Sequence, residues 1–407
     1  MSIDESNYWR VVTPARWPAA PAEMSVSTQA EIDECPRRWA LSTAEYPELW
    51  SGRGYPPKLQ IAALAGSVVH LALEIITKQL TRSGVPSLSD PSASQVLRAL
   101  GGYTHVVEEC VERVLRRYVG NPRAGAMMEC AQRTLQGQVP MLRARVQSML
   151  GRLRLSKGAP AVPAPSLPSP SGPPLRLPLA HGTYSELKVH AKTIGWKGKV
   201  DLLILGDETC EITDFKTGTA GPLHECQVRV YAVLWRLDDE LNPSGRAVDR
   251  LVLAYEGGDV EVAPPSAQEI DDLSHDLLAR RIASEMALAE VIPEARPTVE
   301  SCRYCGVRQL CDAYWGGATP VWEDGRFGDI ELKIIGRHGL TSWDAVVVRS
   351  RKFPEAMPAL LRLQQPHEFR VGSRVRVIDG ALSREPEEDA APVIVALSAL
   401  SEMYCVD

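Results

Sequence analysis

The feature that most constrains the fold is a change of hydrophobic period near the middle of the chain. Three consecutive segments look like successive strands, at Ser185–His190, Ile194–Leu205 and Thr209–Lys216, and the first of them alternates polar and apolar residues. Alternation with period two, bounded by turn residues such as Gly206-Asp207, is typical of β-strands. The next segments predict a helix, a strand and a long helix, at Glu225–Glu240, Ala247–Tyr255 and Ser266–Val291. This order predicts an α/β core in which helices flank a mixed sheet.

The part of the chain before this core is mainly helical. Thr28 and Glu31 stand at capping-box spacing in a predicted helix over Met24–Leu41. A long apolar helix over Leu59–Leu80 and an arginine-rich helical region over Ser92–Leu155 follow. The Pro/Ser/Ala tract at Lys157–Pro178 is incompatible with a helix or a central strand, so we expect a linker or extended loop there.

The last eighty or so residues contain short β-rich runs separated by turns, which predict a small barrel or sandwich. These runs are Ile330–Gly336, Ala345–Arg349, Arg374–Asp379 and Val393–Ala399. A chain of 407 residues is too long for one ordinary core, so two or three structural units are expected. The predicted units are an N-terminal segment (1–58), a helical insertion (59–155), a linker (156–180), the core (181–318) and a small β domain (319–407).

Composition narrows the class of protein. The hydrophobic share of 44% and the charged share of 24% are those of a globular protein. No continuous apolar run has the length of a membrane span, and the first residues do not resemble a secretory signal, so we expect a cytoplasmic protein without a membrane partner. The net charge of −6 does not favour nucleic acid binding by the chain as a whole. Any binding of DNA must therefore depend on a local cluster of basic residues.

Two carboxylates and a lysine are the strongest chemical signal. Asp201 lies in Gly198-Lys-Val-Asp, and Asp214 lies in Asp214-Phe-Lys216 on the next predicted strand. Residues two apart on a strand share a face, so Lys216 is expected beside Asp214. Carboxylate oxygens bind Mg²⁺ or Mn²⁺, and such a cation activates water for phosphodiester hydrolysis. The alternative, a surface ion pair in Asp-x-Lys, is disfavoured because both strands carry their acids in register.

Two further pairs extend this constellation. His70 lies on the long apolar helix with Glu74 one turn later on the same face, although a lone helical histidine is usually a core residue. Gln227 and Tyr231 share one face of the helix that follows the acidic strand, although such a pair alone would more often be ordinary helix surface.

The chain resembles the RecB-type branch of the PD-(D/E)XK nucleases over roughly Ser25 to Tyr314. The residues that carry this resemblance occur in the order of that branch, namely His70, Asp201, Asp214/Lys216 and Gln227/Tyr231. The resemblance implies a restriction-endonuclease-like fold. It implies that His70, Asp201 and Asp214 bind the metal, that Lys216 is the catalytic lysine, and that Gln227 and Tyr231 support the site. Val200 stands where the name-giving proline would precede the first acid. Glu186, on the preceding strand, is a further candidate acid.

Three of the nine cysteines form Cys302-x2-Cys305-x5-Cys311, and the best fourth ligand is the remote Cys35. Four thiolates with one remote member suit a [4Fe–4S] cluster, and structural Zn²⁺ is the alternative. Iron–sulfur members of the RecB-like group, including AddB-type and CRISPR adaptation nucleases, show the same layout, and in them the cluster closes the domain. The isolated cysteines are predicted to be small buried hydrophobes, namely Cys110, Cys130, Cys210, Cys226 and Cys405.

The C-terminal unit resembles an OB-fold barrel around Phe369–Ile378. Trp343 and Phe353 are candidate base-stacking residues, and a basic face is expected from Arg349, Arg351, Lys352, Arg370, Arg374 and Arg376. The alternative is a small packing domain with solvated arginines.

Together these features predict a Mg²⁺- or Mn²⁺-dependent DNA nuclease, acting on single strands or DNA ends in repair, recombination or antiviral defence. No Walker A motif occurs in the chain, so processive action on duplex DNA would require a separate helicase or translocase. Two alternatives remain: a DNA-binding adaptor that does not cut, and a nuclease subunit that is active only with a partner.

Overall fold

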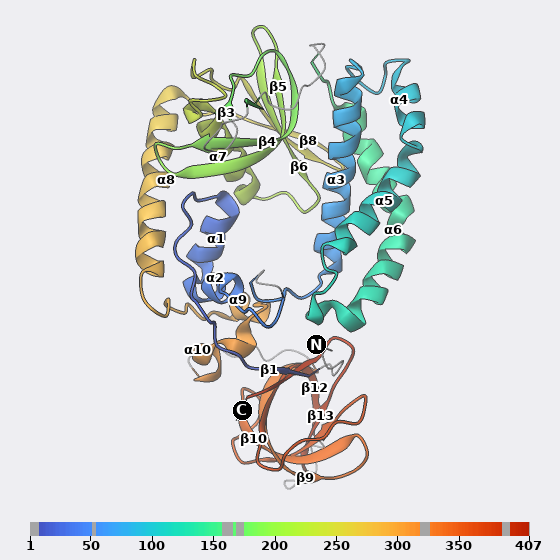
Figure 1. Cartoon of the computed structure of the whole chain (residues 1–407), viewed down its shortest axis with the longest axis vertical. Coiled ribbons are helices and arrows are strands. Elements are labelled where there is room, and N and C mark those ends of the chain that lie inside the picture. Colours follow the sequence, from blue (N-terminus) through green and yellow to red (C-terminus); the bar gives the residue numbers. More distant parts are fainter. Residues whose placement is uncertain are drawn as a thin grey trace.

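Three main hydrophobic cores organise the chain in the computed structural model, which describes residues 8–50, 54–156, 166–167, 175–317, 326–384 and 391–406. One core lies among helices, one surrounds a sheet, and one fills a β-barrel. Figure 1 shows the sheet at the top, a group of helices along its right side and the barrel at the bottom. Most of the predicted linker lies outside the described residues.

The central sheet has five strands in the order β4-β5-β6-β7-β8. The strands are β4 (Gly182–Ala191), β5 (Trp196–Leu205), β6 (Cys210–Lys216), β7 (Arg250–Tyr255) and β8 (Gly258–Val262). Only β6 and β7 run parallel, and helix α7 (Pro222–Leu237) makes the crossover between them. The predicted mixed sheet is therefore confirmed, with β8 as a strand that the hydrophobic pattern did not predict.

Helices cover both faces of this sheet. Leu202, Ile204 and Phe215 pack into the helical core, while Leu203 and Ile212 pack on the opposite side. The helical side consists of α3 (Ile61–Arg82), α4 (Ala93–Ala99), α5 (Gly102–Arg116) and α6 (Gly125–Arg152). The opposite side is covered by α7 and by α8 (Ala267–Leu288), which begins with a complete capping box of Ser266 and Glu269.

Within the described part of the chain, α3 is the one helix whose length and apolar composition would suffice to cross a membrane. It packs against α5, α6 and β4. Val68, Val69 and Leu73 are fully buried in the helical core. This burial accounts for the apolar composition of the helix.

The predicted helix over Met24–Leu41 is wrong in its continuity. The chain forms α1 (Val26–Glu34) and α2 (Pro36–Thr43), separated by Cys35 in an extended conformation. Pro36 disfavours helical geometry at the preceding residue and is itself well suited to the first turn of a new helix. The cap of α1 is Ser25, whose hydroxyl accepts a hydrogen bond from the Thr28 backbone N–H at 3.2 Å.

The C-terminal strands close into a five-stranded barrel in the order β12-β13-β11-β10-β9, with β9 returning to β12. All neighbours are antiparallel except β11 and β13. The strands are β9 (Phe327–Arg337), β10 (Ser342–Ser350), β11 (Pro358–Arg362), β12 (Arg374–Ser383) and β13 (Val393–Ala396). Beyond β12, the sheet continues through β14 (Glu402–Cys405) to the N-terminal β1 (Tyr8–Arg10). The predicted barrel is confirmed.

The predicted base-stacking role of Trp343 on this barrel is wrong. Trp343 is 3% exposed and packs edge-on against Phe369 inside the barrel, and Phe353 is partly buried against the same core. Alternation along β10 places every second residue inside, and the Trp343 ring is one of those that fill the interior.

The predicted basic face of the barrel is only partly exposed. Arg349 and Arg370 lie at exposed positions, whereas Arg351, Lys352 and Arg374 are half-buried. Arg376 is buried and paired with Glu331, which also pairs with Arg374. Arg349 and Arg351 donate to backbone carbonyls of α10 (Asp312–Trp315). These arginines therefore join the barrel to its neighbour.

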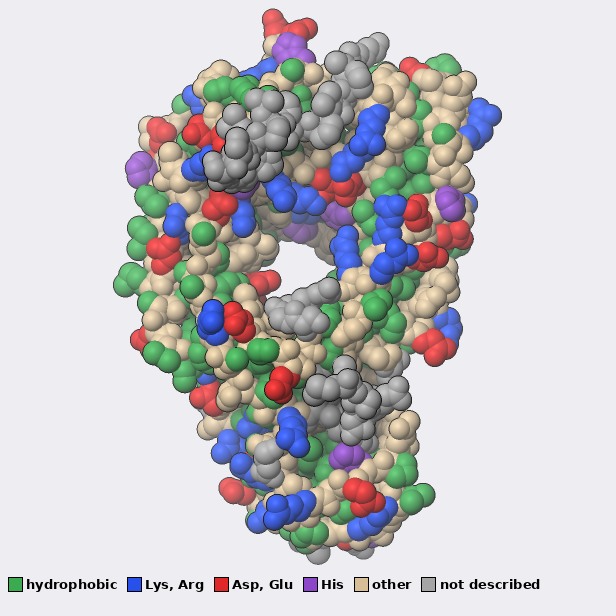
Figure 2. Space-filling model, viewed as in Figure 1, with side chains coloured by type: hydrophobic (Ala, Val, Ile, Leu, Met, Phe, Trp, Pro, Cys, Tyr) green, Lys and Arg blue, Asp and Glu red, His purple; other side chains and the backbone are tan. Residues whose placement is uncertain are grey.

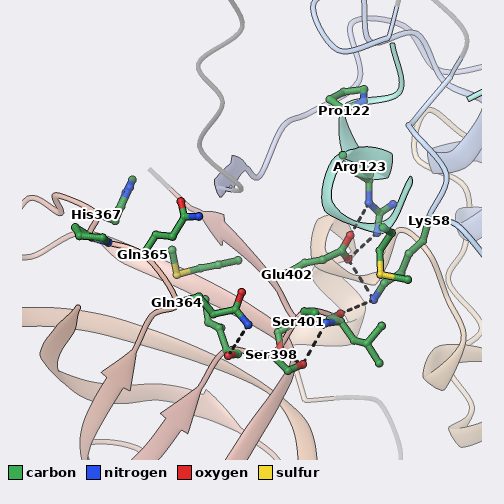
Figure 3. Close-up of a pocket in the computed structure, with 16 residues that line it drawn as sticks. Lys58, Pro122, Arg123, Gln364, Gln365, His367, Ser398, Ser401 and Glu402 are labelled. Carbon is green, nitrogen blue, oxygen red and sulfur yellow. Dashed lines mark hydrogen bonds and ion pairs between the residues drawn. The ribbon is translucent and has the colours of Figure 1, made fainter. Parts of the chain in front are cut away.

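The loop that carries the cysteine triplet completes this junction. It contains α9 (Val299–Arg303), and its Arg308 is 5% exposed and pairs with Asp329 and Asp379 of the barrel. Figure 3 shows a second contact, at a pocket between the helical region and the barrel, where Lys58 and Arg123 converge on Glu402. Arg123 donates to both carboxylate oxygens of Glu402, at 3.0 and 2.8 Å. Buried ion pairs thus bind the barrel to the rest of the chain.

Candidate active site

The two predicted acids lie where the sheet splits. Leu202 on β5 pairs with Thr213 on β6, so Asp201 and Asp214 are the next cross-strand neighbours. Pairing between β5 and β6 stops at this point, while β4 and β5 remain paired to the far end of their hairpin at Ala191. The hairpin therefore projects past β6, and the two carboxylates stand at the fork.

Helix α3 brings His70 to this fork. The Nδ1 atom of His70 lies 3.6 Å from Oδ2 of Asp201, and the same oxygen accepts a hydrogen bond from the Phe215 backbone N–H at 2.7 Å. Phe215 also packs edge-on against the His70 ring. Glu74 lines the same cleft as His70 and pairs with Lys78. The structure thus brings His70, Asp201 and Asp214 to one place.

Asp214 is the most perturbed acid of the site. Its side chain is 4% exposed, and burial together with the charge of Asp201 raises its pKa from 3.8 to about 6. The ammonium of Lys216 lies 2.5 Å from Oδ2 of Asp214 and opposes this shift. Even so, this oxygen makes no well-oriented hydrogen bond to any described residue. A buried carboxylate of this kind favours a cation that can complete its coordination.

A chain of hydrogen bonds holds Lys216 in place. The Lys216 ammonium donates to Oε1 of Gln227 at 2.8 Å, and the Gln227 amide donates to the Tyr231 hydroxyl at 2.7 Å. Tyr231 is buried, and burial together with the negative charge of Asp214 raises its pKa above the ordinary value. The phenol therefore stays protonated, and α7 supplies the two residues that fix the position of the lysine.

Glu186 lies on the other side of the fork, in register with Asp201 across the β4–β5 pair. It adopts a positive φ of 56°, which is costly for a residue with a side chain, and it pairs with Lys199. Glu186, Lys199, His70 and Thr217 line one cleft. Glu186 therefore lies beside the two predicted acids, and its role as a further acid stays a prediction.

His224 is a neighbour of the site that the sequence pattern did not indicate. Its Nδ1 atom lies 2.8 Å from the Tyr255 hydroxyl, and burial and the charge of Lys216 lower its pKa. A neutral imidazole therefore stands beside Lys216. No motif spacing links His224 to Tyr255, because β7 reaches the site only through the parallel pairing with β6.

The donor set fits a hard divalent cation, because two carboxylates and an imidazole meet at the fork of the sheet. Among the described residues, no three His, Cys, Asp or Glu side chains already stand in a complete coordination geometry. The residues that would hold such a cation are His70, Asp201 and Asp214, and Oδ2 of Asp214 makes no well-oriented hydrogen bond to a described residue.

The four predicted cluster cysteines line one small pocket. Burial raises the pKa of Cys302, Cys305 and Cys311, that of Cys305 to about 11. The Sγ atom of Cys35 accepts backbone N–H groups of Arg38 and Arg296, both at 3.4 Å. N–H donors of this kind support thiolate ligands. The donor chemistry suits a soft metal centre. The other cysteines are not all buried as predicted, because Cys130 and Cys226 lie on exposed positions of helices.

Residues 23–312 match the PD-(D/E)XK nuclease superfamily. Because this match covers well over half of the chain, the protein belongs to that superfamily, whose members are metal-dependent nucleases. No curated protein matches the chain. Among solved structures, it is similar to the crystal structure of the tetrameric p202 HIN2, with 12% identity, a TM-score of 0.16 and coverage of 21% of this chain. The chain spans 45% of that protein's length, and this likeness carries no argument about function.

Proposed function

We propose that the protein is a Mg²⁺- or Mn²⁺-dependent deoxyribonuclease of the RecB-like branch, acting on single-stranded DNA or DNA ends. The observation that carries this proposal is the meeting of His70, Asp201, Asp214 and Lys216 at the fork of the sheet. The order of these residues along the chain supports the RecB-like branch.

His70, Asp201 and Asp214 would hold the cation, with Glu186 as a further acid. A bound divalent cation at such a site polarises the phosphoryl oxygen and activates a water molecule. Lys216 places its positive charge where negative charge develops on the phosphate, and it orients the attacking water. Gln227 and Tyr231 keep the ammonium at that position through the hydrogen bonds described above.

Two features support a single strand as substrate. Figure 2 shows an opening through the molecule, and by comparison with Figure 1 it lies between the central sheet, α1 with α2, and α3. Charged side chains border the upper part of this opening (Figure 2). The barrel, numbered from its first strand β9, has the strand order 1-2-3-5-4 with the third and fifth strands parallel. This arrangement supports an OB-like fold, a class that binds nucleic acid strands.

We further propose that Cys35, Cys302, Cys305 and Cys311 hold a [4Fe–4S] cluster that cross-links the two ends of the nuclease domain. The shared pocket and the all-sulfur donor set support this assignment. Anaerobic purification tests it. A brown protein with visible absorption is expected, and a colourless protein that contains zinc would contradict it.

The decisive experiment is a cleavage assay on labelled linear single strands, duplexes and circular DNA with either metal. We expect cleavage of single strands or ends that is abolished by Lys216→Ala and by Asp214→Ala. Cleavage that persists in both variants would refute the assignment of the site. We place the activity in the cytoplasm, in DNA repair, recombination or antiviral defence.

A partner-dependent nuclease is the second candidate. The outer face of α8 exposes Leu278, Ile282 and Met286, which are spaced four residues apart and are 36%, 49% and 70% exposed. An apolar stripe of this kind favours contact with another protein. A helicase or translocase partner would restore activity to a chain that is inactive alone. A non-cutting DNA-binding adaptor is disfavoured because the catalytic set is intact.

A further inference from the structure

A second cleft lies beside the catalytic fork, on the side facing α1. It is lined by Ser25 at the start of α1, by Lys188, Lys197 and Lys199 of the β4–β5 hairpin, and by Gln227 and Tyr231 of α7. We call it the lysine cleft. Lys199 lines both this cleft and the cleft of His70 and Glu186, so the two clefts lie on either side of this residue.

The positive charges of the lysine cleft lie directly opposite one another. Lys188 is the cross-strand neighbour of Lys199, and Lys197 is the neighbour of His190. Like charges at directly opposed positions destabilise a β-ladder. Lys199 is paired with Glu186 and His190 with Glu23. Lys188 and Lys197, in contrast, are exposed and have no ion-pair partner among the residues that the structure describes.

The wall opposite the lysines adds to the positive potential. Helix α1 begins at Ser25, and its first turn contains no acidic residue. The N-terminal end of a helix carries a partial positive charge that favours anions. The lysines and the helix end thus face a common space, and the two nearby carboxylates, Glu23 and Glu186, are already paired with His190 and Lys199. An anion between them would relieve the repulsion.

The position of the cleft relates this anion to the reaction. Gln227 and Tyr231 form part of its wall, and the same two residues hold Lys216 at the catalytic fork. A group bound in the lysine cleft therefore lies next to the bond that is cut, with the α7 side chains between them.

We propose that the lysine cleft binds a phosphate group of the substrate strand adjacent to the phosphate that is hydrolysed, with Lys188 and Lys197 as positioning residues. This inference rests on the proposed nuclease function. The phosphate is either an internal phosphodiester or a terminal monoester, and both present the same oxygens to the lysines.

The test measures binding of labelled single-stranded oligonucleotides in EDTA, which prevents cleavage, across a series of salt concentrations. Lys188→Ala and Lys197→Ala should each weaken binding about fivefold. The salt slope is the slope of the logarithm of the binding constant against the logarithm of the salt concentration. In the double variant its magnitude should fall by about 0.7 for each phosphate that is no longer neutralised. Lys192→Ala is the matched control, because Lys192 lies in the same hairpin but is paired with Glu240 at 2.8 Å outside the cleft. It should bind as the unmodified protein does.

Cleavage assays on the same variants separate positioning from folding. The double variant should raise KM with little change in kcat, and it should melt no lower than the unmodified protein, since a repulsion has been removed. An equal loss of affinity for circular and linear strands identifies the bound group as an internal phosphodiester. A loss of affinity confined to 5′- or 3′-phosphorylated oligonucleotides identifies it as a terminal monoester.

If the double variant binds with unchanged affinity and salt slope while the unmodified protein cleaves DNA normally, the proposed role of the lysine cleft is wrong. The proposed nuclease function is then unaffected. If the unmodified protein neither binds nor cuts DNA with either metal, the proposed function itself fails.

Discussion

Replacing Asp214 by asparagine should stabilise the metal-free protein while abolishing catalysis. The side chain is almost fully buried, and burial and Asp201 raise its pKa from 3.8 to about 6. A shift of this size corresponds to about 3 kcal/mol of unfavourable free energy in the ionised native state, and coupling to Asp201 reduces the share of Asp214 to about 1–3 kcal/mol. Asparagine has a similar shape and no charge, so it avoids this cost.

The sign of the effect follows from proton binding. Because the pKa of Asp214 is higher in the folded chain, the native state binds more protons than the unfolded state between pH 3.8 and about 6. The free energy of unfolding therefore falls as the pH rises through this window and stays low above it. The gain from Asp214→Asn should be largest above pH 6 and should vanish below pH 3.8, where both side chains are neutral.

Thermal melting in EDTA and in Mn²⁺ measures this difference. At neutral pH without metal, the variant should melt roughly 2–12 °C higher, at roughly 2–4 °C per kcal/mol for a domain of ordinary size. Saturating Mn²⁺ should reverse the order, since only the unmodified site gains stability by binding the cation, by about 2.7 kcal/mol at a hundred times Kd.

Asp238 is the matched control for this experiment. It is fully buried, but its carboxylate accepts hydrogen bonds from the backbone N–H groups of His190 and Leu241 and pairs with Arg176. Asp238→Asn should lower the melting temperature in both buffers. If Asp214→Asn also melts lower than the unmodified protein in EDTA, the carboxylate is well accommodated without a cation, and the argument for a strained metal-binding acid fails.

Three further outcomes follow from the same structure. Lys216→Gln should lower kcat by about 10²–10³-fold at unchanged DNA affinity, because it removes a positive charge that is needed only in the transition state. A single-turnover assay measures this, and a smaller loss would mean that another residue stabilises the transition-state charge. His70→Ala should raise the Mn²⁺ concentration for half-maximal activity by about 10–100-fold, measured by metal titration, and an unchanged titration would exclude it as a ligand. Arg308→Met should destabilise the chain by about 3–5 kcal/mol, because Asp329 would remain buried and uncompensated; chemical denaturation measures this, and a loss below about 1 kcal/mol would show that the buried pair is not needed.

Much of the catalytic fork follows from local pattern. Alternation in β5 and β6 places Asp201 and Asp214 on neighbouring strands, and the spacing of Gln227 and Tyr231 on a helix places both on one face. His224 could not be found in this way, because its contact with Tyr255 depends on the parallel return of β7, a tertiary relation. The positive φ of Glu186 is likewise imposed by the fork and has no signal in sequence.

The errors have equally physical causes. The helical period of apolar residues continues through Cys35, and it therefore predicted α1 and α2 as one helix. Pro36 acts on the backbone of the preceding residue, and this local effect ends the first helix. Arg376 was predicted to belong to a solvent-facing basic surface, because the sequence does not reveal that Glu331 and the cysteine loop enclose it. Short strands such as β11 and β14 carry too few residues for alternation to distinguish them from loops.

The parallel pairing of β1 with β14 has a consequence for how the chain is made. Tyr8 pairs with Met403, so a strand that leaves the ribosome early must wait for one that is synthesised near the opposite end of the described chain. Contacts so distant in sequence form late in folding. Until then, β1 has an unpaired edge and the junction around Arg308 lacks its barrel carboxylates. A truncation or a bulky fusion at either end should therefore impair the yield of soluble protein more than the catalytic fork, which is assembled from residues in between.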